Sequence, residues 1–366
     1  MKKLLYCLLV FGVVILSGCS EEAIHDETSS SVQLEEPCAK DDVLTAWCGF
    51  KNPEDLAVTP DNQFLIATGF GGLPDSYVNE IVIIDLATMK KAPAEIVLAD
   101  NIWGDPSCTR ETLELSTHGL DIVQRNDGVS MLAVTNHLPR ETIEFFELLP
   151  NGGGWQLNWK GCVDSPVLNG GARQPMFNDV ALTKSGNFYA TEMYNGKVPF
   201  EEVVNAGVAK EDSGQVWFWS AANGFGPIPN TEGGFPNGIV VGPGEETLFF
   251  NFWFTGETIK FDLETEEVLA KHFGGMADNL TISENSLWTI KHDMSLTEFF
   301  DKCGDTINCF LPFSVYELDF EDLKEKNMWN FDSSAFGFGT VATPVAGKVW
   351  LGSANGDRVA SFELED

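Results

Sequence analysis

The stretch FNDVALTKSGNFYATEM (177–193) decides the fold. It opens with the polar pair Asn178-Asp179, continues as a short apolar segment, turns, and resumes as a second apolar segment. A third apolar segment, GQVWFWS (214–220), follows. Short runs of apolar and aromatic residues between turn residues predict β-strands. Helical periodicity is scarce beyond residue 50, so the chain is expected to be all-β.

The same three-strand unit recurs along the chain, and each copy opens with a polar residue or Gly. The opening segments are PEDLAV (53–58), THGLDI (117–122), FNDVAL (177–182), FPNGIVV (235–241), ADNLTI (277–282) and the weaker GTVAT (339–343). The aligned positions 54, 118, 178, 237, 278 and 339 lie between 41 and 64 residues apart. Repeats of this length made of successive strands predict a six-bladed β-propeller over 38–366. A sandwich would not repeat one strand triplet, and a fourth strand per blade is not evident.

The N-terminus has the features of a bacterial lipoprotein. A short basic region precedes an apolar run over 4–16, which is shorter than the about 20 residues of a spanning helix. The run ends in LSGC (16–19), which predicts a signal peptide over 1–18 and acylation of Cys19. The acidic, Ser-rich remainder of 19–37 reads as a disordered tether. A simple signal peptide or membrane anchor is the alternative.

These features predict a protein of the bacterial cell envelope that is attached to a membrane by lipid. No Asp follows Cys19 directly, and by resemblance to enterobacterial sorting this favours the outer membrane. The inner or outer side, the exposure at the cell surface and the oligomeric state remain open.

The charge balance excludes one class of partner. The chain of 366 residues has 22 Lys+Arg and 55 Asp+Glu, a net charge of −33. Such a surface repels phosphate backbones, so no nucleic-acid binding is expected, whereas cations are attracted. Hydrophobic residues at 43% and aromatic residues at 11% supply a globular core.

Six cysteines remain once Cys7 in the signal and the acylated Cys19 are set aside. An even number in an exported chain predicts disulfides. Proximity in sequence favours Cys38–Cys48, Cys108–Cys162 and Cys303–Cys309 among 15 formal connectivities. The chain has no C-x-x-C, which argues against zinc or thiol-redox chemistry.

Propeller geometry brings the starts of the inner strands to the central channel. Glu54, His118, Asn178, Asn237 and Asp278 should therefore converge there, with Asn279 directly after Asp278. Carboxylate and amide oxygens form a ligand set for a hard cation, and we expect Ca²⁺ rather than zinc or copper. The simpler interpretation is that Asn and Asp recur as turn residues because the blades recur.

A second set of carboxylates lies one residue deeper in the channel. Asp55 and Asp179 would repel each other on a narrow axis unless a cation lay between them. With the carbonyl of Leu120, they predict a second, structural Ca²⁺.

These residues resemble the paraoxonase/arylesterase family, part of the wider set of calcium-dependent propeller lactonases that includes senescence-marker (SMP-30)/gluconolactonase proteins. The resemblance rests on the first five opening segments and VTNH (134–137), and it extends from about residue 45 to the end. It implies a catalytic Ca²⁺ held by Glu54, Asn178, Asn237, Asp278 and Asn279, and a structural Ca²⁺ held by Asp55, Asp179 and the Leu120 carbonyl.

The resemblance also assigns roles to histidines. His118 and His137 match the family's His–His dyad, which gluconolactonase-type members generally lack. His118 would take a proton from water while His137 orients it or relays the proton, with Glu54 or Asp278 as alternative bases. His292 resembles a pocket-wall histidine, and His272 is expected at the surface.

The resulting prediction is a calcium-dependent carboxylic-ester hydrolase acting on small lactones or aryl esters. The alternatives are an envelope-anchored binding propeller with structural Ca²⁺, a sugar lactonase of the gluconolactonase type, and a strictosidine-synthase-like propeller without the metal set. The chain departs from the family at Glu192-Met193, where an acidic pocket residue is usual. It also departs in loops 193–213 and 294–314, which would cover the channel.

Overall fold

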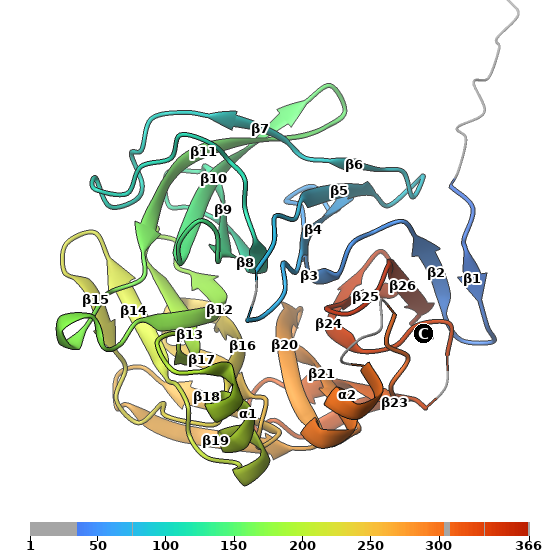
Figure 1. Ribbon diagram of the computed structural model, residues 1–366. Helices are drawn as coiled ribbons and strands as arrows, with labels where there is room; N and C mark the ends of the chain where they lie inside the picture. The colour runs from blue at the N-terminus through green and yellow to red at the C-terminus, as the bar shows by residue number, and fades with distance from the viewer. Residues whose placement is uncertain (1–34, 75, 304–307, 333, 365–366) are drawn as a thin grey trace, which may run out of the picture. The chain divides into compact units, whose positions relative to one another are not determined.

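The computed structural model describes residues 35–366 apart from 75, 304–307, 333 and 365–366. The expected signal peptide, Cys19 and all but the last three residues of the tether lie outside this part. The described residues form six sheets arranged in a ring, so the predicted six-bladed β-propeller is confirmed (Figure 1).

Each sheet runs from an inner strand at the channel to an outer strand at the rim. The inner strands are β3 (Pro53–Val58), β8 (Thr117–Gln124), β12 (Pro175–Leu182), β16 (Pro236–Val241), β20 (Met276–Ser283) and β24 (Gly339–Val345). The second strands are β4 (Phe64–Gly69), β9 (Ser130–Asn136), β13 (Phe188–Asn195), β17 (Thr247–Phe252), β21 (Ser286–His292) and β25 (Lys348–Ser353). The third strands are β5 (Ile81–Asp85), β10 (Thr142–Asn151), β14 (Val216–Ser220), β18 (Glu257–Asp262), β22 (Phe313–Asp319) and β26 (Arg358–Glu363).

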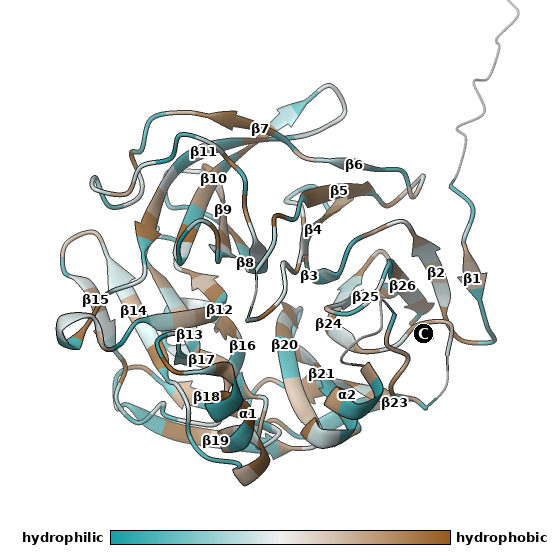
Figure 2. Cartoon of the chain, viewed as in Figure 1, coloured by the Kyte–Doolittle hydropathy of each residue, from teal (hydrophilic) through white to brown (hydrophobic). Residues whose placement is uncertain are grey.

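The sequence did not reveal the outer strands, which are more exposed than the others. They are β6 (Lys91–Pro93), β11 (Gly154–Asp164) with β7 (Glu95–Leu98), β15 (Gly224–Pro227), β19 (Glu267–Phe273), β23 (Glu325–Phe331), and β2 (Thr45–Cys48) with β1 (Ala39–Lys40). Exposure removes the demand for alternating apolar residues. Figure 2 shows that β7 and β19 nevertheless carry hydrophobic stretches, and Val97 and Leu269 there are exposed.

The core lies between neighbouring sheets. Second strands are covered on both faces, so β17 reads TLFFNF without alternation and five of its six residues are buried. One buried cluster joins Leu56 and Leu65 of the first sheet to Val341 and Trp350 of the last. Burial of this kind supplies the main favourable free energy, about 25 cal/mol per Å² of apolar surface.

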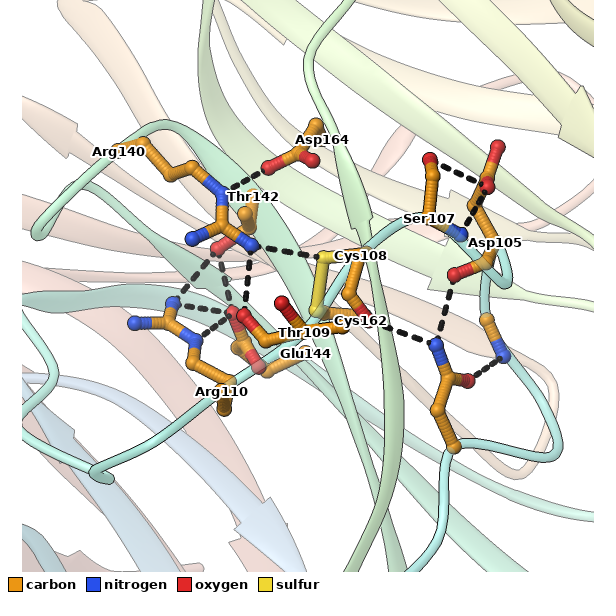
Figure 3. The surroundings of a disulfide bond; sticks show 12 residues. Asp105, Ser107, Cys108, Thr109, Arg110, Arg140, Thr142, Glu144, Cys162 and Asp164 are labelled. Carbon is orange, nitrogen blue, oxygen red and sulfur yellow. Dashed lines mark hydrogen bonds and ion pairs between the residues drawn. A yellow bond between two sulfur atoms is a disulfide. The ribbon is translucent and has the colours of Figure 1, made fainter.

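The ring closes through its N-terminal strand. β2 pairs antiparallel with β26, so residues before the first inner strand complete the last sheet. The three predicted disulfides are present: Cys38–Cys48, Cys108–Cys162 and Cys303–Cys309. Figure 3 shows Cys108–Cys162 joining β11 to the segment that leads into β8.

Two helices occur within the described part of the chain, and they occupy the two loops that did not match the family. They are α1 (Phe200–Ala209) and α2 (Leu296–Cys303), and short 3₁₀ turns lie at Asn169–Gly171 and Pro243–Glu245. A Cβ at Gly207 would lie 2.6 Å from the side chains of Leu296 and Phe254, so a larger residue there would have to displace them. Neither helix is long and apolar enough to cross a membrane.

Candidate metal and catalytic site

A β-bulge interrupts every inner strand, and in five of the six it falls at candidate site residues. The pairing between inner and second strand skips one or two residues in each sheet, and the skipped residues include Glu54, His118, Asn178, Asn237 and Asp278. A bulge re-aims side chains away from the regular alternation. Two successive residues can therefore both be directed toward the channel.

The first bulge residues of five sheets meet at one cavity of about 160 Å³. These residues are Glu54, His118, Asn178, Asn237 and Asp278, and each is at most 5% exposed. The structure thus brings together five side chains that the sequence spreads over 225 positions, as expected from propeller geometry. Asn279 joins them through its Nδ2, which donates a 2.7 Å hydrogen bond to Glu54 Oε1.

Four side-chain oxygens of this group lack hydrogen-bond partners among the described residues. Glu54 Oε2 and the side-chain oxygens of Asn178, Asn237 and Asn279 are buried, and none has a partner among the described residues. A buried polar atom without a partner costs about 1–3 kcal/mol. Glu54, Asn178 and Asn237 line the cavity, and Asn279 contacts Glu54 beside it. Four unpaired oxygens gathered in this way fit an oxygen-binding cation such as Ca²⁺.

The ionisation of the carboxyl groups supports the same fit. Burial, and then the charges of Asp55 and Asp278, raise the pKa of Glu54 well above its usual value. Burial likewise raises the pKa of Asp278. Carboxylates in this position are unstable as anions unless positive charge offsets them. In the described chain no three His, Cys, Asp or Glu side chains are grouped to hold a metal, so the fit depends on the asparagine oxygens.

The deeper carboxylates lie around a second cavity of about 320 Å³. It is lined by residues further along the same inner strands, so the two cavities follow one another along the channel. Asp55 and Asp179 line it together with Asp121, which the sequence analysis did not identify. Burial raises the pKa of Asp55 to about 7 and that of Asp121 to about 6.

Unlike the four unpaired oxygens of the upper group, the oxygens of these carboxylates accept hydrogen bonds from the backbone. Asp55 Oδ2 accepts a 2.9 Å hydrogen bond from the Leu120 N–H, and Asp179 Oδ2 accepts one of 2.9 Å from the Ile239 N–H. Each bond crosses to the next sheet and clamps the two together. Unpaired oxygens therefore occur at the first site and not at the second. Leu120, which was predicted to act through its carbonyl, contacts Asp55 through its N–H.

The two histidines form a chain that ends on a carboxylate. His118 Nδ1 lies 3.0 Å from His137 Nε2, and His137 Nδ1 lies 2.8 Å from Glu141 Oε2. His118 Nε2 lies 3.3 Å from Asn178 Nδ2. His118 lines the cavity and His137 lies behind it. Burial, and then the neighbouring His137, lower the pKa of His118 well below its usual value, so its imidazole is neutral.

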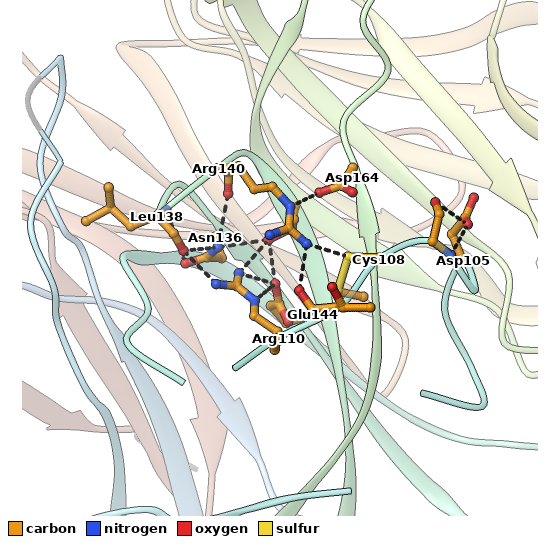
Figure 4. A network of polar contacts seen from close by, with 12 residues as sticks. Asp105, Cys108, Arg110, Asn136, Leu138, Arg140, Glu144 and Asp164 are labelled. Carbon is orange, nitrogen blue, oxygen red and sulfur yellow. Dashed lines mark hydrogen bonds and ion pairs between the residues drawn. A yellow bond between two sulfur atoms is a disulfide. The ribbon is translucent and has the colours of Figure 1, made fainter. Parts of the chain in front are cut away.

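A buried polar network supports the turn that carries His137. Asn136 Nδ2 donates to the carbonyl of Leu138 at 2.7 Å, and Arg110 donates to the same carbonyl at 3.0 Å. Arg110 also forms a buried ion pair with Glu144 (Figure 4). The network fixes the backbone on either side of the histidine.

His292 was predicted to line the pocket, but the structure places it behind Asp278. Its Nε2 donates to the Gly339 carbonyl at 2.8 Å and lies 3.4 Å from Asp278 Oδ2. Trp253 Nε1 donates to its Nδ1 at 3.0 Å. Burial lowers the pKa of His292 to about 4. Both nitrogens are thus engaged, and His292 holds Asp278 rather than contacting a ligand in the cavity.

His272 also differs from expectation, because it is buried and not at the surface. It bridges Lys291 Nζ, at 2.9 Å, and Glu325, at 3.0 Å. Glu192 lies outside the cavity and accepts hydrogen bonds from Arg173 and Trp217, whereas Met193 lines the cavity.

Apolar side chains make the walls and roof of the upper cavity. The helix residues are Phe200, Val203, Val204, Leu296, Phe299 and Phe300, and the loop residues include Phe70, Phe235, Trp253, Phe254 and Phe338. Sequence analysis missed these residues and Glu141. An acidic residue four positions after His137 was the only signal for Glu141 in the sequence.

Comparisons with known proteins show the fold alone. No protein-family model matches the chain, and no curated protein matches it. A luciferin-regenerating enzyme has a TM-score of 0.50 and 10% identity over 86% of this chain and 92% of that chain. Virginiamycin B lyase from Staphylococcus aureus has a TM-score of 0.48 and 11% identity, covering 88% and 99% of the two chains. The PQQ-bound aldose sugar dehydrogenase from Streptomyces coelicolor has a TM-score of 0.48 and 14% identity, covering 90% and 99%.

Proposed function

We propose that the protein is a calcium-dependent hydrolase of lactones or aryl esters. The observation that carries the proposal is the set of four unpaired buried oxygens, three of them on residues that line the same cavity as His118. Glu54, Asn178, Asn237, Asp278 and Asn279 would hold the ion. When bound, Ca²⁺ would polarise the ester carbonyl and stabilise negative charge on its oxygen.

The chain's own residues would manage the proton. His118 Nε2 accepts a proton from water, and the water oxygen forms a bond to the carbonyl carbon. The ester C–O bond then breaks, and the departing oxygen takes the proton back from His118. General base catalysis of this kind contributes roughly 10²- to 10⁴-fold.

The walls of the cavity favour an apolar substrate. Aromatic residues of the loops and of α1 and α2 surround a polar floor, so an aryl or alkyl group would lie against them while the ester group reaches the floor. We also propose the lower carboxylates as a structural Ca²⁺ site, and Cys19 as the attachment of the protein to the envelope through a lipid.

Hydrolysis of phenyl acetate and a panel of lactones, with calcium and with chelator, tests the proposal. We expect turnover with calcium that disappears on chelation and returns with added calcium. Turnover that ignores the chelator contradicts the metal's role. No turnover on any substrate by folded protein that binds calcium indicates instead a binding propeller with structural Ca²⁺.

A further inference from the structure

We propose that Glu141 is a positioning residue that sets the direction of hydrogen bonding through the two histidines, so that His118 presents a lone pair to the cavity. This inference rests on the proposed function, because it explains how His118 becomes the proton acceptor. Glu141 itself does not line the cavity. It acts through His137, which lies between Glu141 and His118.

The Glu141 carboxylate can only accept hydrogen bonds. Glu141 Oε2 lies 2.8 Å from His137 Nδ1, so that nitrogen must carry the proton. Glu141 Oε1 accepts a 2.8 Å hydrogen bond from the Phe177 N–H. Both oxygens are therefore occupied, and the carboxylate is fixed between a turn of the second sheet and β12 of the third.

The proton on His137 Nδ1 sets the direction of hydrogen bonding through both rings. A neutral imidazole has one donor and one acceptor nitrogen. In neutral His137, donation from Nδ1 leaves Nε2 as an acceptor, and the nitrogen 3.0 Å away, His118 Nδ1, then donates to it. His118 Nε2 is then left as the acceptor, and it is the nitrogen nearest the amide of Asn178.

The contact between His118 and Asn178 is consistent with this direction of hydrogen bonding. Asn178 offers its Nδ2 donor to His118 Nε2 at 3.3 Å, which leaves its Oδ1 unpaired. The opposite direction would place a His118 N–H against this amide donor. Reversal would thus remove the lone pair needed for the proton transfer.

Glu141→Gln should reverse the direction of these hydrogen bonds while keeping the number of heavy atoms in the side chain the same. The buried Phe177 N–H still needs an acceptor, so the single Gln oxygen stays with it and the NH₂ group faces His137 Nδ1. His137 must then accept at Nδ1 and donate from Nε2. His118 accepts at Nδ1, and its Nε2–H points at the cavity.

Nitrogen-15 NMR of the histidine rings measures this directly, because protonated and unprotonated ring nitrogens have different chemical shifts. The protein has five histidines, and His118→Gln and His137→Gln variants would assign the two signals. In wild type we expect Nδ1–H on both rings. In Glu141→Gln we expect Nε2–H on both, with kcat lower by roughly 10²- to 10⁴-fold and little change in KM or melting temperature.

Glu192→Gln is the matched control, since Glu192 is another buried glutamate but touches neither histidine. It should leave both ring tautomers and kcat unchanged. An Nε2–H signal from His118 in wild type overturns the inference, as does a Glu141→Gln protein with unaltered tautomers. The wild-type spectrum decides even if the variant does not fold. Correct tautomers without hydrolysis of any panel substrate would refute the proposed function and leave the positioning role standing.

Discussion

At the scale of single residues, the unpaired oxygens give the most direct test of metal binding. Asn237→Leu removes one of them and keeps the side-chain volume similar. Asn237→Leu should lower the melting temperature more in calcium than in chelator, because the Asn237 oxygen would have a binding partner only when calcium is bound. Turnover should also be lost. Thermal unfolding in both conditions, with an ester assay, measures the two effects.

Asn158→Leu provides the control for this prediction. Asn158 also has a side-chain oxygen that is buried and unpaired, but it lies on β11, away from the upper cavity. Its melting temperature should shift by the same amount with and without calcium. If Asn237→Leu behaves in the same way, Asn237 does not bind the ion.

Residue-level prediction from sequence succeeded where the fold alone determines position. The starts of inner strands must face the channel, so Glu54, Asn178 and Asp278 could be identified without knowing their contacts. Glu141 could not, because its role depends on a turn that returns it to His137 and on a backbone N–H from another sheet. His292 was wrongly expected to line the cavity, because its position behind Asp278 depends on contacts with Gly339 and Trp253 that the sequence does not show.

At the scale of elements, the network behind the histidine turn should contribute strongly to stability. Arg110 and Glu144 are both buried, and Trp159 Nε1 donates to the other oxygen of Glu144 at 2.8 Å. Arg110→Met leaves the carboxylate buried without its cation, which costs about 3–5 kcal/mol. Urea unfolding at neutral pH measures the loss.

The double variant Arg110→Met/Glu144→Met separates the ion pair from packing. Removing both charges relieves the unpaired carboxylate, so the double variant should recover part of the stability that Arg110→Met loses. A double variant no more stable than the single one would show that packing, and not the unpaired charge, causes the effect.

β19 and β21 meet where Lys291 contacts His272, and the protonation of Lys291 should make stability depend on pH. Lys291 is buried, its Nζ donates to the Gly256 carbonyl at 3.2 Å, and burial lowers its pKa to about 7. Folding favours the neutral amine, so the unfolded chain binds more protons between pH 7 and the ordinary lysine pKa. The free energy of unfolding should therefore rise with pH in this window and fall as pH drops toward 7.

The expected contribution of Lys291 is roughly 2 kcal/mol between pH 7 and pH 9. Groups facing it are His272, Glu257 and Glu325, so the measurement is the difference between wild type and Lys291→Met across this range. Equal pH dependence of the two proteins would contradict a neutral Lys291 in the fold.

The elements also show which structural features the sequence hid. Strand triplets were visible because second strands are buried on both faces, whereas outer strands such as β15 carry no such requirement. The bulges were invisible because they depend on pairing with the neighbouring strand. Gly119 marks one of them: a Cβ there would lie 2.2 Å from Asp179 Oδ1, so the adjacent sheet demands glycine.

At the scale of the whole molecule, the disulfides differ in the length of chain that they close. Cys108–Cys162 spans 54 residues, whereas Cys38–Cys48 spans 10. In the chain-entropy account, the longer loop stabilises by about 4 kcal/mol and the shorter by about 3 kcal/mol. Replacing Cys108 and Cys162 by Ala should therefore destabilise the propeller more than replacing Cys38 and Cys48, as measured by chemical unfolding of each pair variant. The reverse order would indicate that Cys38–Cys48 acts mainly by holding β2 against β26 and so by closing the ring.

Calcium dependence of global stability would count the ions that the channel is proposed to hold. Each ion bound only to the folded state adds about 1.4 kcal/mol to the free energy of unfolding for every tenfold rise in free calcium above its dissociation constant. Two ions predict about 2.7 kcal/mol per decade in the wild-type protein.

Asp55→Asn should reduce this to about 1.4 kcal/mol if Asp55 holds the lower ion. If Asp55 acts only as a clamp on the Leu120 N–H, the variant should be less stable at every calcium concentration but keep the wild-type slope. If the wild-type slope is near 1.4 kcal/mol per decade and Asp55→Asn does not change it, the channel binds only the upper ion. The deeper carboxylates then serve to join neighbouring blades.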